Sequence, residues 1–124
     1  LKSVLSLSNM GATYYLKEKI EKAKKILLEA QQIYDKYSKG VNNLGLVYWK
    51  LGDVKMAKKY FKEALTSQYP YRGAYENLAL MSLAECDLVT ARKWLKLFLG
   101  NDLVKINKYI KVYYKNKDLT CDAF

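Results

Sequence analysis

A pattern of small and large residues that returns every 34 positions constrains the fold of this chain more than any other feature. The small residues Gly11, Gly45 and Ala79 stand at this interval, and an apolar residue precedes each of them. A second small set and a large set recur at the same interval: Ala23, Ala57, Ala91 and Leu27, Phe61, Leu95. The period predicts three copies of one structural unit, at about 4–37, 38–71 and 72–105, without insertions or deletions.

Composition indicates that these units are helical. The chain of 124 residues contains one Pro and six Gly, and its apolar residues favour helical spacing over alternation. An apolar share of 51% is sufficient for a core at this length. We therefore expect helices and no strands, in one domain.

The stretch 38–71 resembles a tetratricopeptide repeat (TPR). The residues that carry the resemblance are Leu44, Gly45, Tyr48, Ala57, Phe61 and Ala64. In this family small residues let two antiparallel helices approach, and large residues fill the seam between them. The resemblance implies an all-α fold, a right-handed α-α superhelix (TPR solenoid) of three helical hairpins plus a C-terminal capping helix. Three repeats are about the minimum for a stable stack, because each hairpin leaves an apolar face that its neighbour covers.

The expected helices follow from apolar spacing and from capping signals. They span about 4–16, 20–34, 39–51, 54–67, 71–84, 88–99 and 102–116. Ser3 is the expected N-cap of the first helix, Gly52-Asp53 ends one helix and begins the next, and Pro70 suits the first turn of the fifth. We expect a single TPR domain over 1–117 and a frayed tail over 117–124. Because the chain starts at Leu1 without Met, we expect it to be a fragment.

The last predicted helix is interpreted as the cap of the repeats. Tyr113 stands where a fourth repeat would have a small residue. Its expected apolar side consists of Leu103, Ile106, Ile110, Tyr113 and Tyr114, and its lysines face elsewhere. Such a helix would solvate the end of the stack.

The resemblance also implies a concave binding groove formed by the first helix of each hairpin. Asn9, Asn43 and Asn77 recur at the same interval and resemble an asparagine ladder that would bind the backbone of a peptide. The expected apolar contacts of the groove are Tyr15, Leu46, Trp49 and Leu80. The alternative for all of these residues is packing between helices. The groove predicts a non-catalytic adaptor that binds a peptide or helix of another protein.

Binding of a C-terminal carboxylate by the clamp of Lys, Asn and Arg found in some TPR domains is not expected. The corresponding positions are Ser8, Ala12, Asn43, Gly73 and Asn77. Asn43 alone suits such a clamp, so a carboxylate would meet almost no positive charge.

A basic stripe is predicted on the outward helices. It consists of Lys24, Lys25, Lys58, Lys59, Lys62, Arg92, Lys93 and Lys96, in a chain with a formal charge of +10. Such a stripe suits an acidic protein or an anionic membrane surface, or it is a solvated face that keeps the protein soluble. Nucleic acid is a weaker hypothesis, because the aromatic residues are not expected to interleave with this stripe, as a surface that stacks single strands would require. A third alternative is a solenoid segment that mediates self-association.

Catalysis, cofactors and metals are not expected. The chain has no His, which removes the commonest general base and metal ligand, and no Gly-rich phosphate loop. Cys86 and Cys121 stand in no zinc or CxxC spacing. Reduced thiols in the cytosol and unpaired cysteines in a bacterial envelope both fit, so the compartment stays open, as do the partner and the oligomeric state.

Overall fold

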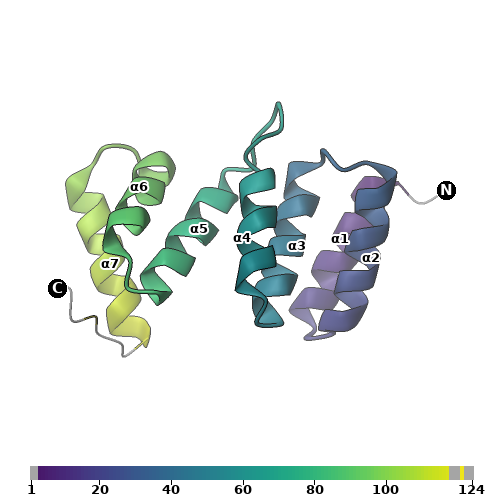
Figure 1. Cartoon of the computed structure of the whole chain (residues 1–124), viewed down its shortest axis with the longest axis horizontal. Helices are drawn as coiled ribbons and strands as arrows, with labels where there is room; N and C mark the ends of the chain where they lie inside the picture. The colour runs from purple at the N-terminus through teal and green to yellow at the C-terminus, as the bar shows by residue number, and fades with distance from the viewer. Residues whose placement is uncertain (1–2, 118–120, 122–124) are drawn as a thin grey trace. The chain divides into compact units, whose positions relative to one another are not determined.

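Seven α-helices and no strands form the part of the chain that the computed structural model describes, residues 3–117 and Cys121 (Figure 1). The chain divides into two compact units, Leu1–Ala74 and Tyr75–Phe124. The first unit contains α1 (Val4–Leu16), α2 (Ile20–Ile33), α3 (Ser38–Lys50) and α4 (Val54–Glu63). The second contains most of α5 (Gly73–Ala84), then α6 (Leu88–Leu99) and α7 (Leu103–Lys117). The all-α prediction is confirmed for the described residues.

Two helical hairpins build the first unit. The helix α1 lies beside α2, α3 lies beside α4, and α2 also packs against α3 (Figure 1). The small and large positions of the 34-residue period meet inside each hairpin. A Cβ atom added to Gly45 would lie 2.5 Å from two atoms of the Phe61 ring, and one added to Gly11 would collide with Leu27. The period therefore records where two backbones approach closely.

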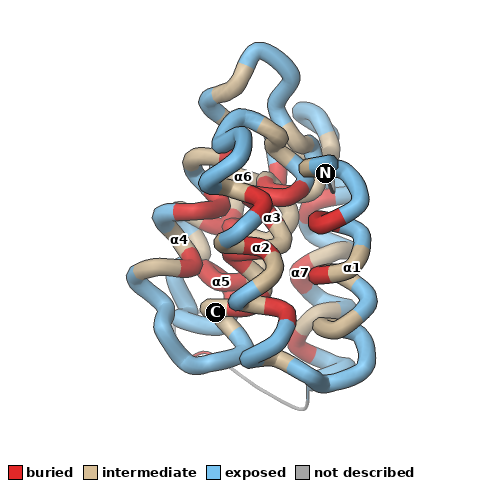
Figure 2. Tube along the Cα trace, turned by 90° about the vertical axis from the view of Figure 1, so that its right-hand side faces the viewer, coloured by how far each residue is buried: buried red, intermediate tan, exposed pale blue. Residues whose placement is uncertain are grey.

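The second unit packs three helices around its own core. Ala79 of α5 and Leu95 of α6 are fully buried in one cluster with Ile106 and Ile110 of α7. The hydroxyl of Tyr114 donates a hydrogen bond of 2.7 Å to the carbonyl oxygen of Leu83, which joins α7 to α5. The buried residues lie along the helices, whereas most connecting turns are exposed (Figure 2).

Side-chain caps define four of the described helix starts, including that of α7, where the Asp102 carboxylate accepts hydrogen bonds from the amides of Val104 and Lys105. The Ser3 hydroxyl accepts a hydrogen bond from the Ser6 amide, and the carboxylates of Asp53 and Asp87 do the same for Met56 and Thr90. These caps satisfy amides that the first turn leaves without helical partners. The predicted N-caps at Ser3 and Asp53 are confirmed, and the predicted bounds of α1 and α6 match the structure.

The largest error in the predicted helices concerns the connection from α4 to α5. The helix α4 ends at Glu63, not near Ser67, because the Thr66 amide and hydroxyl both bind the Glu63 carbonyl oxygen and draw the chain into a turn. Pro70 was expected in the first turn of α5, but α5 begins at Gly73. That placement was wrong, since the chain completes a turn at Tyr71 before the helix begins.

A left-handed backbone conformation recurs in the turn of each hairpin. The φ angles are 62° at Glu18, 84° at Gly52 and 58° at Cys86, and these residues are also 34 positions apart. Glycine adopts this conformation without steric cost, whereas other residues pay roughly 1–2 kcal/mol. The turn geometry is thus a property of the repeat, although the sequence marks it with glycine once.

We expect Gly52→Ala to lower the free energy of unfolding by about 1 kcal/mol. No atom lies within 4 Å of an added Cβ at this position, so the cost is backbone strain and not a clash. At Glu18 the same rule predicts that Glu18→Gly is more stable than Glu18→Ala by about 1 kcal/mol. Lys25 is an exposed residue inside α2, so Lys25→Ala should be more stable than Lys25→Gly, the opposite order. Denaturant unfolding followed by circular dichroism measures all five variants, and alanine being equal to glycine at positions 18 and 52 would contradict the strain.

The two cysteines are joined in a disulfide bond. Cys86 lies in the turn between α5 and α6, and its Cα atom is 5.6 Å from that of Cys121. Cys121 is buried in the core of the second unit. The predicted tail over 117–124 otherwise lies outside the described residues, but at Cys121 the expectation of a frayed end was wrong.

None of the helices in the described part of the chain has the length and hydrophobicity of a membrane span.

Candidate functional site

A depression of about 200 Å³ lies on the first unit between α1 and α3. Tyr15, Leu46, Trp49 and Lys50 line it, and the three apolar residues are half-buried. These three are the residues of the first unit that the sequence predicted as apolar contacts of a groove. The structure therefore brings them together on one surface, where they can contact a common ligand.

Trp49 belongs to both the depression and the core. Its ring meets the ring of Phe61 edge to face, with centroids 6.1 Å apart. This contact holds the indole in place, so packing and ligand contact do not exclude each other at this residue. Lys50 lies 3.7 Å from the carboxylate of Glu18, an exposed ion pair at the edge of the depression.

The predicted asparagine ladder is placed in part. Asn9 is exposed and Asn43 is half-buried, both in the first unit, and among the described residues neither side-chain amide has a hydrogen-bond partner. Asn77 and Leu80 belong to the second unit, where Asn77 has a polar interaction. Alignment of the three amides along one groove stays a prediction.

Lysines of the predicted basic stripe contact aromatic rings. The ammonium groups of Lys24 and Lys59 lie 5.2 Å and 5.8 Å from the ring centroids of Tyr48 and Tyr60. The two tyrosine rings stack on each other, with centroids 5.4 Å apart. The argument that aromatic residues do not interleave with the lysines was therefore wrong. Tyr48 is an inter-helix residue of α3, and the linear sequence does not show that it reaches α2.

The remaining stripe residues are engaged to different degrees. Lys93 of α6 lies 5.3 Å from the Trp94 ring centroid, and Arg92 donates a hydrogen bond of 2.9 Å to the Asn107 side chain. Lys25, Lys62 and Lys96 are exposed. Part of the basic charge thus stabilises contacts between helices, and the use of the stripe as a docking surface stays a prediction.

A polar cavity of about 500 Å³, which the sequence did not indicate, lies at the loops of the first unit. It is lined by residues that include Asp35, Ser38, Glu63 and Tyr69. The Ser38 hydroxyl donates a hydrogen bond of 2.7 Å to the Tyr69 carbonyl oxygen and links the two loops. Within the described residues no group of three or more acidic or cysteine side chains is arranged to hold a metal ion.

Burial raises the pKa of several tyrosines. The Tyr60 phenol lies against α3, and the nearby Tyr48 and Glu63 add to the effect of burial on its pKa. In the second unit burial also raises the pKa of Tyr113 and Tyr114. These phenols remain neutral and pack between helices, and that of Tyr114 donates the hydrogen bond to Leu83.

The arrangement defines a class of protein, an all-α protein of repeated helical hairpins with an open apolar depression between the first two of them. A family model described as "Tetratricopeptide repeat" matches residues 39–69. A solved structure described as a functional characterization of PilF from Pseudomonas aeruginosa has a TM-score of 0.72 and 26% sequence identity. The alignment covers 94% of this chain and 55% of that one, so this chain spans about half the length of its structural relative. No curated protein matches the chain.

The stretch 39–69 is thus similar to a tetratricopeptide repeat, as the 34-residue period indicated, and the fold of the chain is similar to that of the PilF structure. The matched residues 39–69 contain α3 and α4, including the Gly45 and Phe61 contact. They also contain Leu46 and Trp49 of the depression.

Proposed function

We propose that this chain is a non-catalytic adaptor that binds a peptide or helix of a partner protein against α1 and α3. The observation that carries the proposal is the depression formed by Tyr15, Leu46 and Trp49. Aromatic and aliphatic side chains that converge on a shallow site are the usual anchors of peptide recognition. The family supports the same conclusion, since tetratricopeptide repeats generally bind other proteins.

The polar groups near the depression suit a peptide backbone. Asn9 and Asn43 lie on the same two helices as the apolar residues, and their amides are available to ligands. An amide side chain offers two donors and one acceptor, which can pair with a backbone whatever its side chains are. In this proposal the apolar residues select the ligand side chain, and the asparagines fix the direction of the chain. Asn77 and Leu80 belong to the second unit, and the proposal does not use them.

A selection from a displayed library of random peptides tests the proposal. We expect the enriched peptides to contain a large apolar residue and to lose at least about tenfold in affinity for the Tyr15→Ala, Leu46→Ala double variant. Asn43→Ala should weaken the same peptides by about fivefold, the effect of one lost hydrogen bond. Tyr69→Ala is the matched control, because this tyrosine is 77% exposed and does not line the depression. Circular dichroism verifies the fold of each variant.

Two results would contradict the assignment. Peptides that bind the double variant as tightly as the original chain would show that the depression is not the binding site. If salt, and the Lys58→Glu and Lys59→Glu substitutions, strongly weakened peptide binding, the binding site would be the basic stripe.

A further inference from the structure

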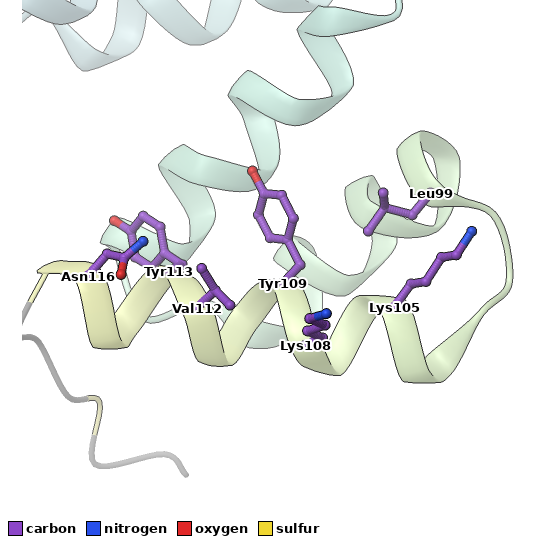
Figure 3. A pocket seen from close by; sticks show the side chains of 7 residues that line it. All are labelled: Leu99, Lys105, Lys108, Tyr109, Val112, Tyr113 and Asn116. Carbon is purple, nitrogen blue, oxygen red and sulfur yellow. The ribbon is translucent and has the colours of Figure 1, made fainter.

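The outer side of α7 carries an apolar groove that the adaptor proposal does not use. The groove has a volume of about 460 Å³ (Figure 3). Its lining comes from the last residue of α6 and from α7: Leu99, Lys105, Lys108, Tyr109, Val112, Tyr113 and Asn116. The expected cap was a helix that solvates the end of the repeats. The five lysines of α7 fit that role, but Leu103, Val104 and Val112 are exposed apolar residues.

The floor of the groove is fixed in place. The Tyr109 hydroxyl donates a hydrogen bond of 2.8 Å to the Glu76 carboxylate of α5, and burial together with this bond raises the pKa of the phenol. The ring of Tyr113 packs edge to face against that of Tyr114, with centroids 5.0 Å apart, and Tyr114 is buried in the core. Figure 3 shows Tyr109 and Tyr113 extending from the same side of α7. A preformed surface of this kind loses little conformational entropy when a ligand binds.

The shape of the groove suits a helix better than a small molecule. The lining residues from Lys105 to Asn116 span roughly 16 Å of α7, because each helical residue advances 1.5 Å. Apart from Leu99 of α6, the described lining residues all come from this one helix, so among them the groove is a shallow, elongated surface. Small-molecule sites usually bury most of the ligand, whereas an amphipathic helix buries one face and leaves the other in water.

The charge of the groove selects among occupants. The helix α7 contains five lysines and no acidic residue, and Lys105 and Lys108 belong to the lining. A second copy of α7 would bring like charges together, which disfavours self-association. A membrane surface would contact protruding side chains, whereas Tyr109 and Tyr113 are half-buried and recessed. The complementary ligand is convex, apolar along one face and acidic along its edges.

We propose that the groove on α7 binds an amphipathic helix of another protein whose apolar face is bordered by Asp or Glu. Val112, Tyr113 and Leu99 contact the apolar face of this helix. Lys105 and Lys108 pair with its carboxylates and set its orientation. This site is separate from the depression between α1 and α3, so the chain presents two docking surfaces of different specificity.

Two synthetic peptides test the proposal by fluorescence anisotropy with the full chain. Both are amphipathic helices about four turns long with leucine along one face, one with glutamate at both edges and one with lysine. We expect the acidic helix to bind at least about tenfold more tightly at low salt, with a difference that shrinks as salt is added. Lys105→Glu with Lys108→Glu should reverse the preference. Equal binding of the two peptides would overturn the proposal.

Matched variants locate the binding site. Val112→Asp should weaken binding of the acidic helix by about tenfold, because it places a carboxylate on the apolar floor, close to those of the peptide. Val89→Asp is the control, since Val89 is 83% exposed on α6 and does not line the groove. The Tyr15→Ala, Leu46→Ala variant should bind the acidic helix normally, which separates this result from the adaptor proposal. Circular dichroism establishes that Val112→Asp folds.

Other occupants would appear as distinct results, and each would overturn the proposal. A dimer in light scattering that Val112→Asp dissociates would identify a second copy as the occupant. Binding to phosphatidylglycerol vesicles that Val112→Asp abolishes, with no binding of the acidic helix, would identify a membrane surface.

Discussion

Phe61→Ala will lower the free energy of unfolding by about 3–5 kcal/mol, enough to unfold much of a marginally stable chain. The Phe61 ring is fully buried in the space that Gly45 leaves open, and it supports Trp49 edge to face. Its removal leaves a cavity between α3 and α4 that the hairpin cannot fill without moving its backbone. Urea unfolding followed by circular dichroism measures the loss. Tyr69 is an exposed aromatic residue of similar size and supplies the control, because Tyr69→Ala should change the free energy of unfolding by less than about 0.5 kcal/mol.

The repeats supply a sharper form of this test. The second repeat pairs Gly45 with Phe61, and the third places Ala79 and Leu95 at the same positions. Gly45→Ala alone should cost about 1–3 kcal/mol, because the new Cβ atom meets the Phe61 ring. Adding Phe61→Leu should recover part of this loss and give a favourable coupling of about 1 kcal/mol in a double-mutant cycle. Strictly additive effects would show that the two positions do not form one packing unit.

The pairing of small and large residues across each hairpin explains why the fold could be predicted from the sequence. The 34-residue period is a pattern of contacts, so the register of Gly11 with Leu27 and of Gly45 with Phe61 follows from it directly. The left-handed turn at Glu18 was not predicted, because a glutamate in the sequence does not indicate the positive φ angle that the structure has there. The end of α4 was also missed, since it depends on hydrogen bonds of the Thr66 side chain and amide that apolar spacing does not reveal.

The candidate sites were predictable to different extents. Tyr15, Leu46 and Trp49 were found because equivalent positions of a repeat share a face, and these residues line one depression. The groove on α7 was not found, because Tyr109 and Val112, which line it, were not assigned to the apolar side of that helix, whereas Leu103 was. Leu103 is 61% exposed, whereas Ile106 and Ile110 on the same apolar side are buried. Apolar spacing identifies a face of a helix but does not show how far along the helix its neighbours extend.

The disulfide illustrates a further limit. Cys86 occupies the turn position at which the preceding repeat has Gly52, 34 residues earlier. The partner of Cys86 depends on the path of the chain after α7, which the repeat does not specify. The two cysteines are 35 residues apart, and α6 and α7 lie between them.

Removal of the disulfide by Cys86→Ser with Cys121→Ser should destabilise the chain by about 4 kcal/mol, the loop-closure entropy expected for a loop of this length. The intact bond restricts the unfolded chain, and it holds the buried Cys121 against the core of α5, α6 and α7. Hydrogen exchange measured by mass spectrometry should show faster exchange in these helices for the variant, and for the original chain after reduction. Thiols that titrate fully in the unreduced, unfolded chain, or exchange that reduction leaves unchanged, would contradict the bond.

A second variant separates the disulfide from the turn that contains it. Cys86 has a φ of 58°, so Cys86→Ser keeps an unfavourable backbone conformation, whereas Cys86→Gly relieves it. In the Cys121→Ser background, Cys86→Gly should therefore be more stable than Cys86→Ser by about 1 kcal/mol. The remaining difference in the free energy of unfolding between the Cys86→Gly variant and the disulfide-bonded chain then measures how much the cross-link itself stabilises the fold. If Cys86→Gly and Cys86→Ser had equal stability, the turn would not hold the left-handed geometry that Gly52 has in the preceding hairpin.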